Sequence, residues 1–462
     1  MPHLPENPSL EHLRRQARTL LRQFRAADAE ALALLREHHP RPHEPLRLAD
    51  AQLVVARSYG FASWPALRRH MDVVGRFARS PHTVPPSADA ADELLRLGCV
   101  RYGGDSRADQ ARAAALLAEH PELSGANLFT AAAIGDAVAA RAFLDGDPDA
   151  ANRPGGPFGW EPLLYLAYSR IGGDAVPVAR LLLDHGADPN AGYLWEGTYP
   201  FTALTGAFGG GEDRGNQPPH PQGLALARML LEAGADPNDA QAVYNLSWTP
   251  GDAWLELLLE FGFATGDGGP WRARLGSAQA TPRENAEDCL MWATHHGFAH
   301  RVSLLLDAGV DPDGRGTEHP ILHGRSALEV AVRNGHADTA DALRAAGARE
   351  PQLAAADEIA AAYMRADPSV SAPPPPGLIA RAAEFGRADA VALLLERGAD
   401  VNAMPGRATA LHEAALRGDR PLVDLLLAAG ADPSIRDPEF DADAAGWATH
   451  AGHHDLATHL TV

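Results

Sequence analysis

Lysine is absent from this sequence of 462 residues, so all 40 of the side chains counted as lysine or arginine are arginine. Without lysine, the chain cannot form a Schiff base with pyridoxal phosphate or with an aldehyde substrate. It also lacks the lysine with which a P-loop binds nucleotide phosphates. The absence therefore excludes two large classes of enzyme. Arginine without lysine, beside abundant alanine and glycine, is typical of GC-rich coding and predicts a bacterial source, similar to actinobacteria.

Cysteine is scarce, and long apolar runs are missing. The two cysteines, Cys99 and Cys289, cannot provide a disulfide framework for a chain of this length. The first residues, MPHLPENPSLEHLRR, contain no apolar signal-peptide core, and nowhere do eighteen apolar residues follow one another. We therefore expect a cytoplasmic protein that does not enter membranes. A hydrophobic content of 45% excludes general disorder.

Acidic residues outnumber basic residues in this sequence. The 40 arginines face 60 acidic residues, which gives a formal net charge of −20 at pH 7. Such a chain repels nucleic acid phosphates unless its charges are segregated, and no basic block occurs beyond the N-terminal segment. The composition predicts no nucleic acid partner and favours a basic protein surface instead.

What the sequence has in abundance is one repeated phrase. Three leucines, two variable residues and Gly-Ala-Asp-Pro-Asn recur, with variations, and each copy is typical of the end of an amphipathic helix. The leucines form an apolar stripe, and the glycine takes the left-handed conformation just after the last turn. The clear copies occupy 181–190, 229–238, 304–313, 393–402 and 425–434, with weaker copies at 257–266 and 342–350.

A second helix is expected before each phrase. Its best copy runs from Thr409 to Gly418, where Thr409 would cap the helix, His412 would bond back to that threonine and Gly418 would end it. Together with the phrase, this segment resembles the ankyrin repeat. The resemblance implies an all-α ankyrin-repeat solenoid of stacked helix-turn-helix units, with nine or ten units from about residue 90 onward. The spacing between copies varies widely, so we expect long insertions.

The chain divides into five expected segments. Residues 1–78 predict four short helices and resemble the helical N-terminal segment of some bacterial ankyrin-repeat proteins, either as a partner-binding module or as a cap on the first repeat. A proline-containing linker is expected at 79–89, and ankyrin repeats with long insertions at 90–350. Residues 351–377 read as a degenerate repeat with a proline-rich spacer, and 378–462 as C-terminal ankyrin repeats.

Aromatic residues and arginines gather at the variable positions of the first helices. If these positions face the concave side of the stack, they form a binding surface, because aromatic and arginine side chains dominate binding hot spots. Alternatively, the long insertions fold back and the aromatic residues pack beneath them. The candidate binding residues are Tyr165, Tyr168, Trp195, Tyr199, Trp292, His295, His296, Arg333, Arg381, Arg417 and Trp447, with Trp160, Trp248, Trp271 and His450 nearby.

Metal and cofactor sites are not expected. The pairs His296/His300 and His319/His323 have the spacing of ligands on one helix, but glycine or proline interrupts each pair. No nucleophile motif occurs either. The remaining route to catalysis is acid–base chemistry without a cofactor. The candidate residues for it are His295, together with Glu161 or Asp288.

Ankyrin repeats imply a scaffold that binds a protein partner through its concave aromatic face and its loops. The alternative is a small-molecule-binding protein or a cofactor-independent enzyme of the cyclase or isomerase type, which would use the aromatic groove of the middle repeats. The sequence leaves open whether the protein is an enzyme.

Overall fold

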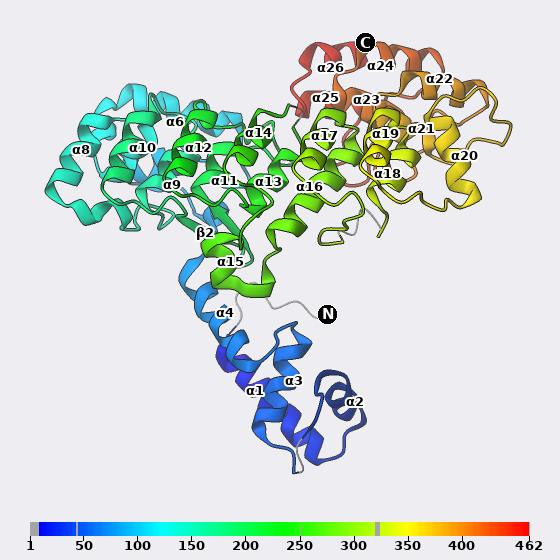
Figure 1. The fold of residues 1–462 in the computed structure, drawn as a ribbon. Coiled ribbons are helices and arrows are strands. Elements are labelled where there is room, and N and C mark those ends of the chain that lie inside the picture. The colour runs from blue at the N-terminus through cyan, green and yellow to red at the C-terminus, as the bar shows by residue number, and fades with distance from the viewer. Residues whose placement is uncertain (1–8, 43–44, 250, 319–323, 462) are drawn as a thin grey trace. The chain divides into compact units, whose positions relative to one another are not determined.

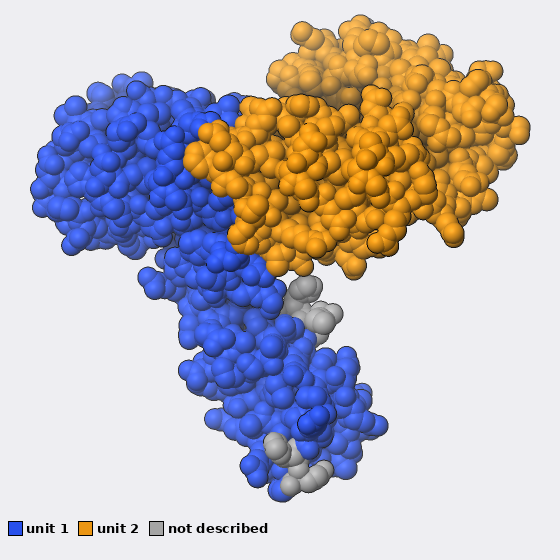
Figure 2. Space-filling model, in the orientation of Figure 1, with its two compact units in different colours: residues 1–209, 219–242, 267–279 blue, residues 210–218, 243–266, 280–462 orange. Residues whose placement is uncertain are grey.

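The computed structural model describes residues 9–42, 45–249, 251–318 and 324–461, in which 26 α-helices and three short strands occur (Figure 1). The all-α repeat architecture with a helical N-terminal segment is therefore confirmed. The chain forms two compact units (Figure 2). Unit 1 comprises residues 1–209, 219–242 and 267–279, and unit 2 comprises residues 210–218, 243–266 and 280–462.

The N-terminal segment of unit 1 folds around an apolar core of its own. Leu13, Leu20, Val54 and Leu67 lie in this core. The side chains of Ser9 and Ser63 accept hydrogen bonds from the first turns of the helices that they precede. The four expected helices are α1 (Leu10–Arg25), α2 (Ala29–His38), α3 (Leu48–Ser58) and α4 (Trp64–Phe77).

Helix pairs form the rest of unit 1. The helices are α5 (Ala90–Gly98), α6 (Arg107–Glu119), α7 (Leu128–Ile134), α8 (Ala137–Gly146), α9 (Pro162–Tyr168), α10 (Ala175–Asp184), α11 (Ala203–Phe208), α12 (Gly223–Glu232) and α15 (Gly269–Leu275). Short 3-10 helices lie at Pro81–Thr83, Pro121–Gly125, Pro148–Asn152 and Gly276–Ala278. Helix α13 (Ala240–Leu246) begins in unit 1 and ends in unit 2.

A small sheet joins the N-terminal segment to the insertion after α10. Strand β2 (Gly192–Trp195) pairs antiparallel with β3 (Tyr199–Thr202), and β1 (Ala78–Arg79) pairs parallel with β2. Trp271 of α15 packs beside Leu194 and Val74 and donates its indole N–H to the carbonyl of Asn190. Tyr199–Phe201 lie in β3, where the two-stranded hairpin satisfies their backbone groups.

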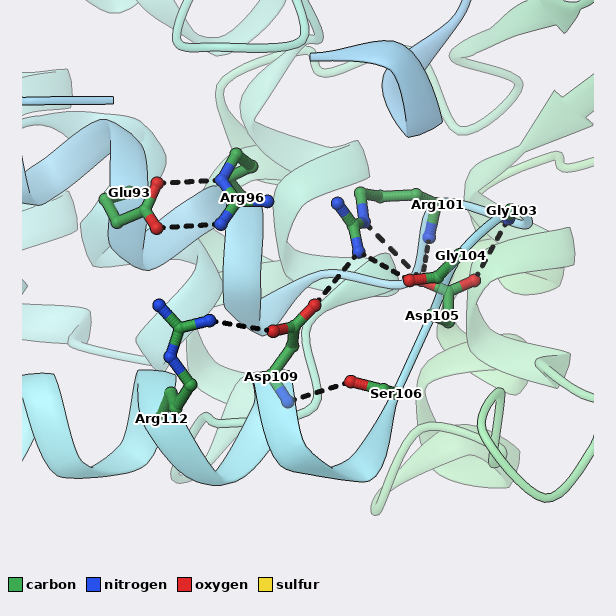
Figure 3. Close-up of polar contacts among 9 residues, drawn as sticks. All are labelled: Glu93, Arg96, Arg101, Gly103, Gly104, Asp105, Ser106, Asp109 and Arg112. Carbon is green, nitrogen blue, oxygen red and sulfur yellow. Dashed lines mark hydrogen bonds and ion pairs between the residues drawn. The ribbon is translucent and has the colours of Figure 1, made fainter. Parts of the chain in front are cut away.

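The connection between α5 and α6 is held by ionic contacts (Figure 3). Asp105 is 9% exposed and accepts hydrogen bonds from the backbone N–H groups of Arg101 and Gly103. The Arg101 guanidinium donates to the carbonyl of Gly104 and to Asp109. A buried charge is tolerated only when paired, and this network pairs Arg101.

Unit 2 repeats the helix pairs of unit 1. Its helices are α14 (Ala253–Glu260), α16 (Pro282–His296), α17 (Ala299–Asp307), α18 (Ala327–Asn334), α19 (Ala337–Ala345), α20 (Ala355–Met364), α21 (Leu378–Glu384), α22 (Ala388–Glu396), α23 (Ala410–Arg417), α24 (Arg420–Ala428), α25 (Ala444–His450) and α26 (His454–Leu460). One apolar core runs from α20 to α26, with Leu394, Leu411 and Leu426 at its centre.

Local contacts reproduce the features on which the resemblance was based. Thr409 caps α23, and its hydroxyl lies 2.8 Å from Nδ1 of His412. All seven glycines of the repeated phrase have positive φ, between 79° and 99°. These glycines are Gly186, Gly234, Gly262, Gly309, Gly347, Gly398 and Gly430. Among the described residues, none of the helices has both the length and the apolar character needed to cross a bilayer.

Candidate binding surface

Two rows of side chains cross the first helices of unit 2. Each of these helices is followed, directly or after one residue, by a glycine. The residues two positions before that glycine form one row, and the residues five positions before it form the other. Three residues separate the rows, which is nearly one helical turn, so both rows lie on the same helix face. The first row contains His295, Arg333 and Glu384, and the second contains Trp292, Arg381 and Glu413.

We call these six residues, together with His296 and Arg417, the Glu384 surface. Helices α16, α18, α21 and α23 provide them, and Figure 1 labels these helices in unit 2. Within the unit, α18 packs against α16, and α23 packs against α21. Stacking of equivalent helices places equivalent positions of successive repeats side by side. The structure therefore brings together six of the binding residues predicted from the sequence: Trp292, His295, His296, Arg333, Arg381 and Arg417.

A pocket of about 460 Å³ opens on this surface. Its charged lining includes Arg333, Arg381, Glu384 and Glu413. The remainder is mainly apolar and consists of alanine, proline and leucine side chains from α20, α21 and the loop before α23. Pockets of roughly 300–1,000 Å³, apolar with a few convergent polar groups, are typical of ligand sites.

Arg381 is the least satisfied arginine in the pocket. Its Nη2 donates a hydrogen bond to the side-chain oxygen of Asn334, and no carboxylate of the described residues lies within ion-pair distance. Burial and, to a smaller extent, the neighbouring charge of Arg333 lower the pKa of Arg381 to about 10. In contrast, the Nη1 of Arg333 lies 2.6 Å from the carboxylate of Asp357. Arg381 therefore retains donors for another group.

Glu384 connects the aromatic side of the surface to the pocket. Its carboxylate lies 3.8 Å from Nε2 of His295, and its side chain is 42% exposed. Its backbone carbonyl accepts a hydrogen bond of 3.1 Å from Arg417. Burial opposes the charge of Glu384, but the neighbouring positive charges of His295 and Arg381 outweigh this effect and lower the pKa of Glu384.

Glu413 is a half-buried acid on α23. Among the described residues, no hydrogen bond or ion pair reaches its carboxylate. Burial raises the pKa of Glu413 to about 7, and the negative charge of Glu384 contributes to the increase. A carboxylate in this position is costly to the free protein, because neither water nor a partner fully solvates it.

The aromatic side of the surface is largely covered. Trp292 is only 4% exposed, and its ring stacks on His296 with a centroid distance of 5.9 Å and packs on Trp248 at 5.4 Å. Burial lowers the pKa of His296 to about 4. The prediction that Trp292 faces solvent is wrong, because the loop carrying Trp248 folds over it. His295 remains partly exposed beside it, with 19% of its side chain accessible.

The aromatic candidates of unit 1 form a separate core. Tyr165 and Tyr168 are fully buried, and their rings pack on Trp160, which is also buried. Their hydroxyls donate to the carbonyls of Gly155 and Thr202, which belong to the insertions before α9 and α11. Tyr165 and Tyr168 therefore do not face solvent, and the second of the two alternatives holds for them. The insertions fold back, and these aromatic residues pack beneath them.

The remaining aromatic candidates differ in exposure. Trp195 packs on Phe201 in the hairpin, whereas Tyr199 is 53% exposed. Trp447 lies on α25 with only 6% exposure and donates its indole N–H to Asp437 at 2.9 Å. The predicted exposure of Trp447 is also wrong, because its indole holds the loop before α25.

The three acid–base candidates lie in different units. Glu161 belongs to unit 1, where burial raises its pKa, whereas Asp288 and His295 belong to unit 2. Asp288 accepts hydrogen bonds from the backbone N–H and the hydroxyl of Thr317 and so holds the loop after α17. The pair His319/His323 lies outside the described residues. Among those described, no group of three potential metal-ligating side chains comes together.

Sequence reasoning missed Glu384 and Glu413. Glu384 occupies the same position, relative to its glycine, as His295 and Arg333, and Glu413 occupies the same position as Trp292 and Arg381. The register of the repeats therefore contained the signal. Aromatic residues and arginines are conspicuous at these positions, whereas two acids among 60 do not stand out.

Comparison with known proteins agrees with the repeat geometry. Residues 352–437 match the family model for ankyrin repeats (3 copies), a range that includes α20 to α24 and most of the pocket lining. A search of curated proteins finds no match to the sequence. The repeated phrase, the capped helix pairs and this match together show that the chain contains ankyrin repeats.

Proposed function

We propose that the Glu384 surface is the face through which this protein binds a protein partner. Ankyrin repeats make the chain a scaffold for protein–protein interaction. One observation supports the choice of this face. Charged side chains from α18, α21 and α23 line one pocket, and Arg381 retains hydrogen-bond donors there that no carboxylate of the described residues accepts. Elsewhere in the described structure, the buried arginines Arg301 and Arg170 donate hydrogen bonds to backbone carbonyls of their own unit.

A basic protein is the partner that the charge favours. The chain carries a net charge of −20, and the exposed part of Glu384 adds negative charge at the pocket. Cys99 and Cys289 are both free and buried, which fits the reducing cytoplasm of a bacterial cell as the place of action.

Partner capture tests the proposed face. Arg381→Gln and Arg417→Gln each remove a guanidinium from the Glu384 surface, and Arg349→Gln removes an arginine whose side chain is 88% exposed on the loop after α19. The same protein should be enriched from native lysate by the wild type and the Arg349→Gln control, and at least tenfold less by the two surface variants. Quantitative mass spectrometry measures the enrichment. Equal capture by all four folded proteins would refute the proposed face.

A further inference from the structure

We propose that the pocket of the Glu384 surface holds a basic side chain of the partner, an arginine or lysine, with its charged end between Glu384 and Glu413. The inference rests on the proposed function, because it assigns the chemistry of the group that enters this face. Three features of the pocket support it: the charges of the lining residues that remain after internal ion pairing, the apolar part of the lining, and the half-buried position of the two carboxylates.

Internal pairing leaves negative charge in excess. The lining contains three arginines and three acids. Arg333 pairs with Asp357 at 2.6 Å, and Arg407 pairs at 3.5 Å with Glu439, which is not part of the lining. Arg381 then remains against two carboxylates, Glu384 and Glu413. A single positive charge brought in by a ligand would neutralise the pocket.

The lining also suits the stem of a basic side chain. Arginine and lysine place a flexible chain of methylene groups against apolar surface and keep the charged end near polar partners. In this pocket, the apolar part of the lining lies beside the carboxylates of Glu384 and Glu413. It is formed by Ala356, Ala360, Pro375, Pro376, Leu378, Pro405 and Ala408.

Glu413 provides the main interaction. Its carboxylate has no partner among the described residues. The like charge of Glu384 acts on it, and the nearby charges of Arg407 and Arg417 offset this effect only in part. A guanidinium or ammonium group would supply the missing hydrogen-bond donors. Charge-assisted hydrogen bonds of this kind are stronger than neutral ones.

An anionic ligand fits less well. It would gain Arg381, but it would have to enter beside Glu384, whose charge is only partly offset by His295 at 3.8 Å. It would also meet Glu413 in its ionised form above pH 7. A carboxylate ligand is therefore the alternative against which the experiment is designed.

Four small probes separate the possibilities. N-acetylarginine methylamide and N-acetyllysine methylamide carry the proposed group, N-acetylglutamate methylamide carries the opposite charge, and N-acetylnorleucine methylamide provides a neutral control. At pH 8, calorimetry with the full chain should show that at least one basic probe binds about tenfold or more tightly than the glutamate and norleucine probes.

Variants locate the binding. Glu413→Gln and Glu384→Gln should each weaken the basic probe by about tenfold, because each removes one charged acceptor. Glu396→Gln changes an exposed acid on α22 of the same unit and should have no effect. Circular dichroism confirms that each variant is folded. The Glu413→Gln substitution is nearly isosteric, so loss of the fold is not expected.

Two outcomes would overturn the inference. One is preferred binding of the glutamate probe that Arg381→Gln abolishes, and the other is the absence of binding by both basic probes. If the probes fail but partner capture still depends on Arg381 and Arg417, the proposed face stands and only its specificity is wrong. If a basic probe binds as expected but capture is insensitive to the surface variants, the pocket stands and the proposed function fails.

Discussion

At the scale of single residues, several arginines act as caps for backbone carbonyls. Arg387 donates to the carbonyl of Gly335, and Arg417 donates to that of Glu384, in each case the preceding repeat of the stack. Arg301 is the extreme case, because it is 1% exposed and donates to three carbonyls and to Asp252. A lysine has one charged atom and cannot reach several carbonyls in a fork. The absence of lysine is therefore compatible with how positive charge is used here.

Arg301→Lys should destabilise unit 2 by about 2–4 kcal/mol, because the ammonium leaves several buried carbonyls and Asp252 without donors. Urea unfolding followed by tryptophan fluorescence measures the loss. Arg349→Lys, at a side chain that is 88% exposed, serves as the matched control and should change stability by less than about 0.5 kcal/mol. A similar small effect of both substitutions would contradict the capping role.

Glu413 should make stability depend on pH in a predictable direction. Its folded pKa, about 7, lies above the ordinary value of 4.5, so its contribution to stability is fully present below pH 4.5 and is lost as the pH rises through 7. Glutamine cannot ionise. Glu413→Gln should therefore be more stable than the wild type by about 1–3 kcal/mol at pH 8 and nearly equal to it at pH 4.5.

Denaturation midpoints of the two proteins, measured across this pH range, give the difference. Glu396→Gln should follow the wild type throughout. A difference between Glu413→Gln and the wild type that does not change with pH would show that the carboxyl is not held in a costly environment.

At the scale of elements, the glycines that end helices fall into two groups. At Gly430, φ is 89° and an added Cβ would meet nothing within 4 Å, so only the backbone conformation requires glycine. At Gly335, φ is 75° and an added Cβ would lie 2.5 Å from the carbonyl oxygen of Met364. Here the close approach of the next repeat requires glycine as well.

Gly430→Ala should cost about 1–2 kcal/mol, from left-handed strain alone. Gly335→Ala should cost about 2–5 kcal/mol, because α18 must also move away from Met364. Thermal unfolding of the two variants compares the costs. Equal losses would mean that the repeats are free to separate at this point.

The helices of the repeats could be predicted because each depends on local signals. The repeated phrase, the cap at Thr409 and the glycine after each helix lie within a few residues of the structure that they determine. The hairpin at 192–202 and helix α15 could not be predicted in the same way. They are held by Trp271 and Leu194, which come from distant parts of the sequence.

The candidate site was predicted only in part, for a related reason. Position on a helix face follows from the repeat register, so the arginines and His295 were found. Exposure depends on what the insertions cover, so Tyr165, Tyr168 and Trp292 were placed incorrectly. Glu413 becomes noticeable only when its lack of a partner is known, and that is a property of the folded chain.

At the scale of the whole molecule, a net charge of −20 should act on the approach of a basic partner, while Glu413 acts after contact. Raising the ionic strength from about 0.1 M to 1 M shortens the screening length from about 10 Å to 3 Å. The association rate of a labelled arginine-rich peptide should therefore fall by about tenfold or more.

Glu413→Gln should instead mainly increase the dissociation rate. Stopped-flow fluorescence separates the two rates, and a peptide with glutamine in place of arginine provides the control. An association rate that does not respond to salt would show that the overall charge plays no part in the encounter.

The contacts of Arg301 also have a consequence for synthesis of the chain. Its carbonyl partners in residues 246–251 precede it by 50 to 55 positions. At about 5–20 residues per second, a ribosome needs roughly 3–10 s to add the residues between them. During that interval the carbonyls at the end of α13 and in the following loop have been synthesised, but the Arg301 guanidinium that donates hydrogen bonds to them has not. The nascent chain therefore holds an unfinished repeat for several seconds, and this is the stage at which we expect chaperones to bind it.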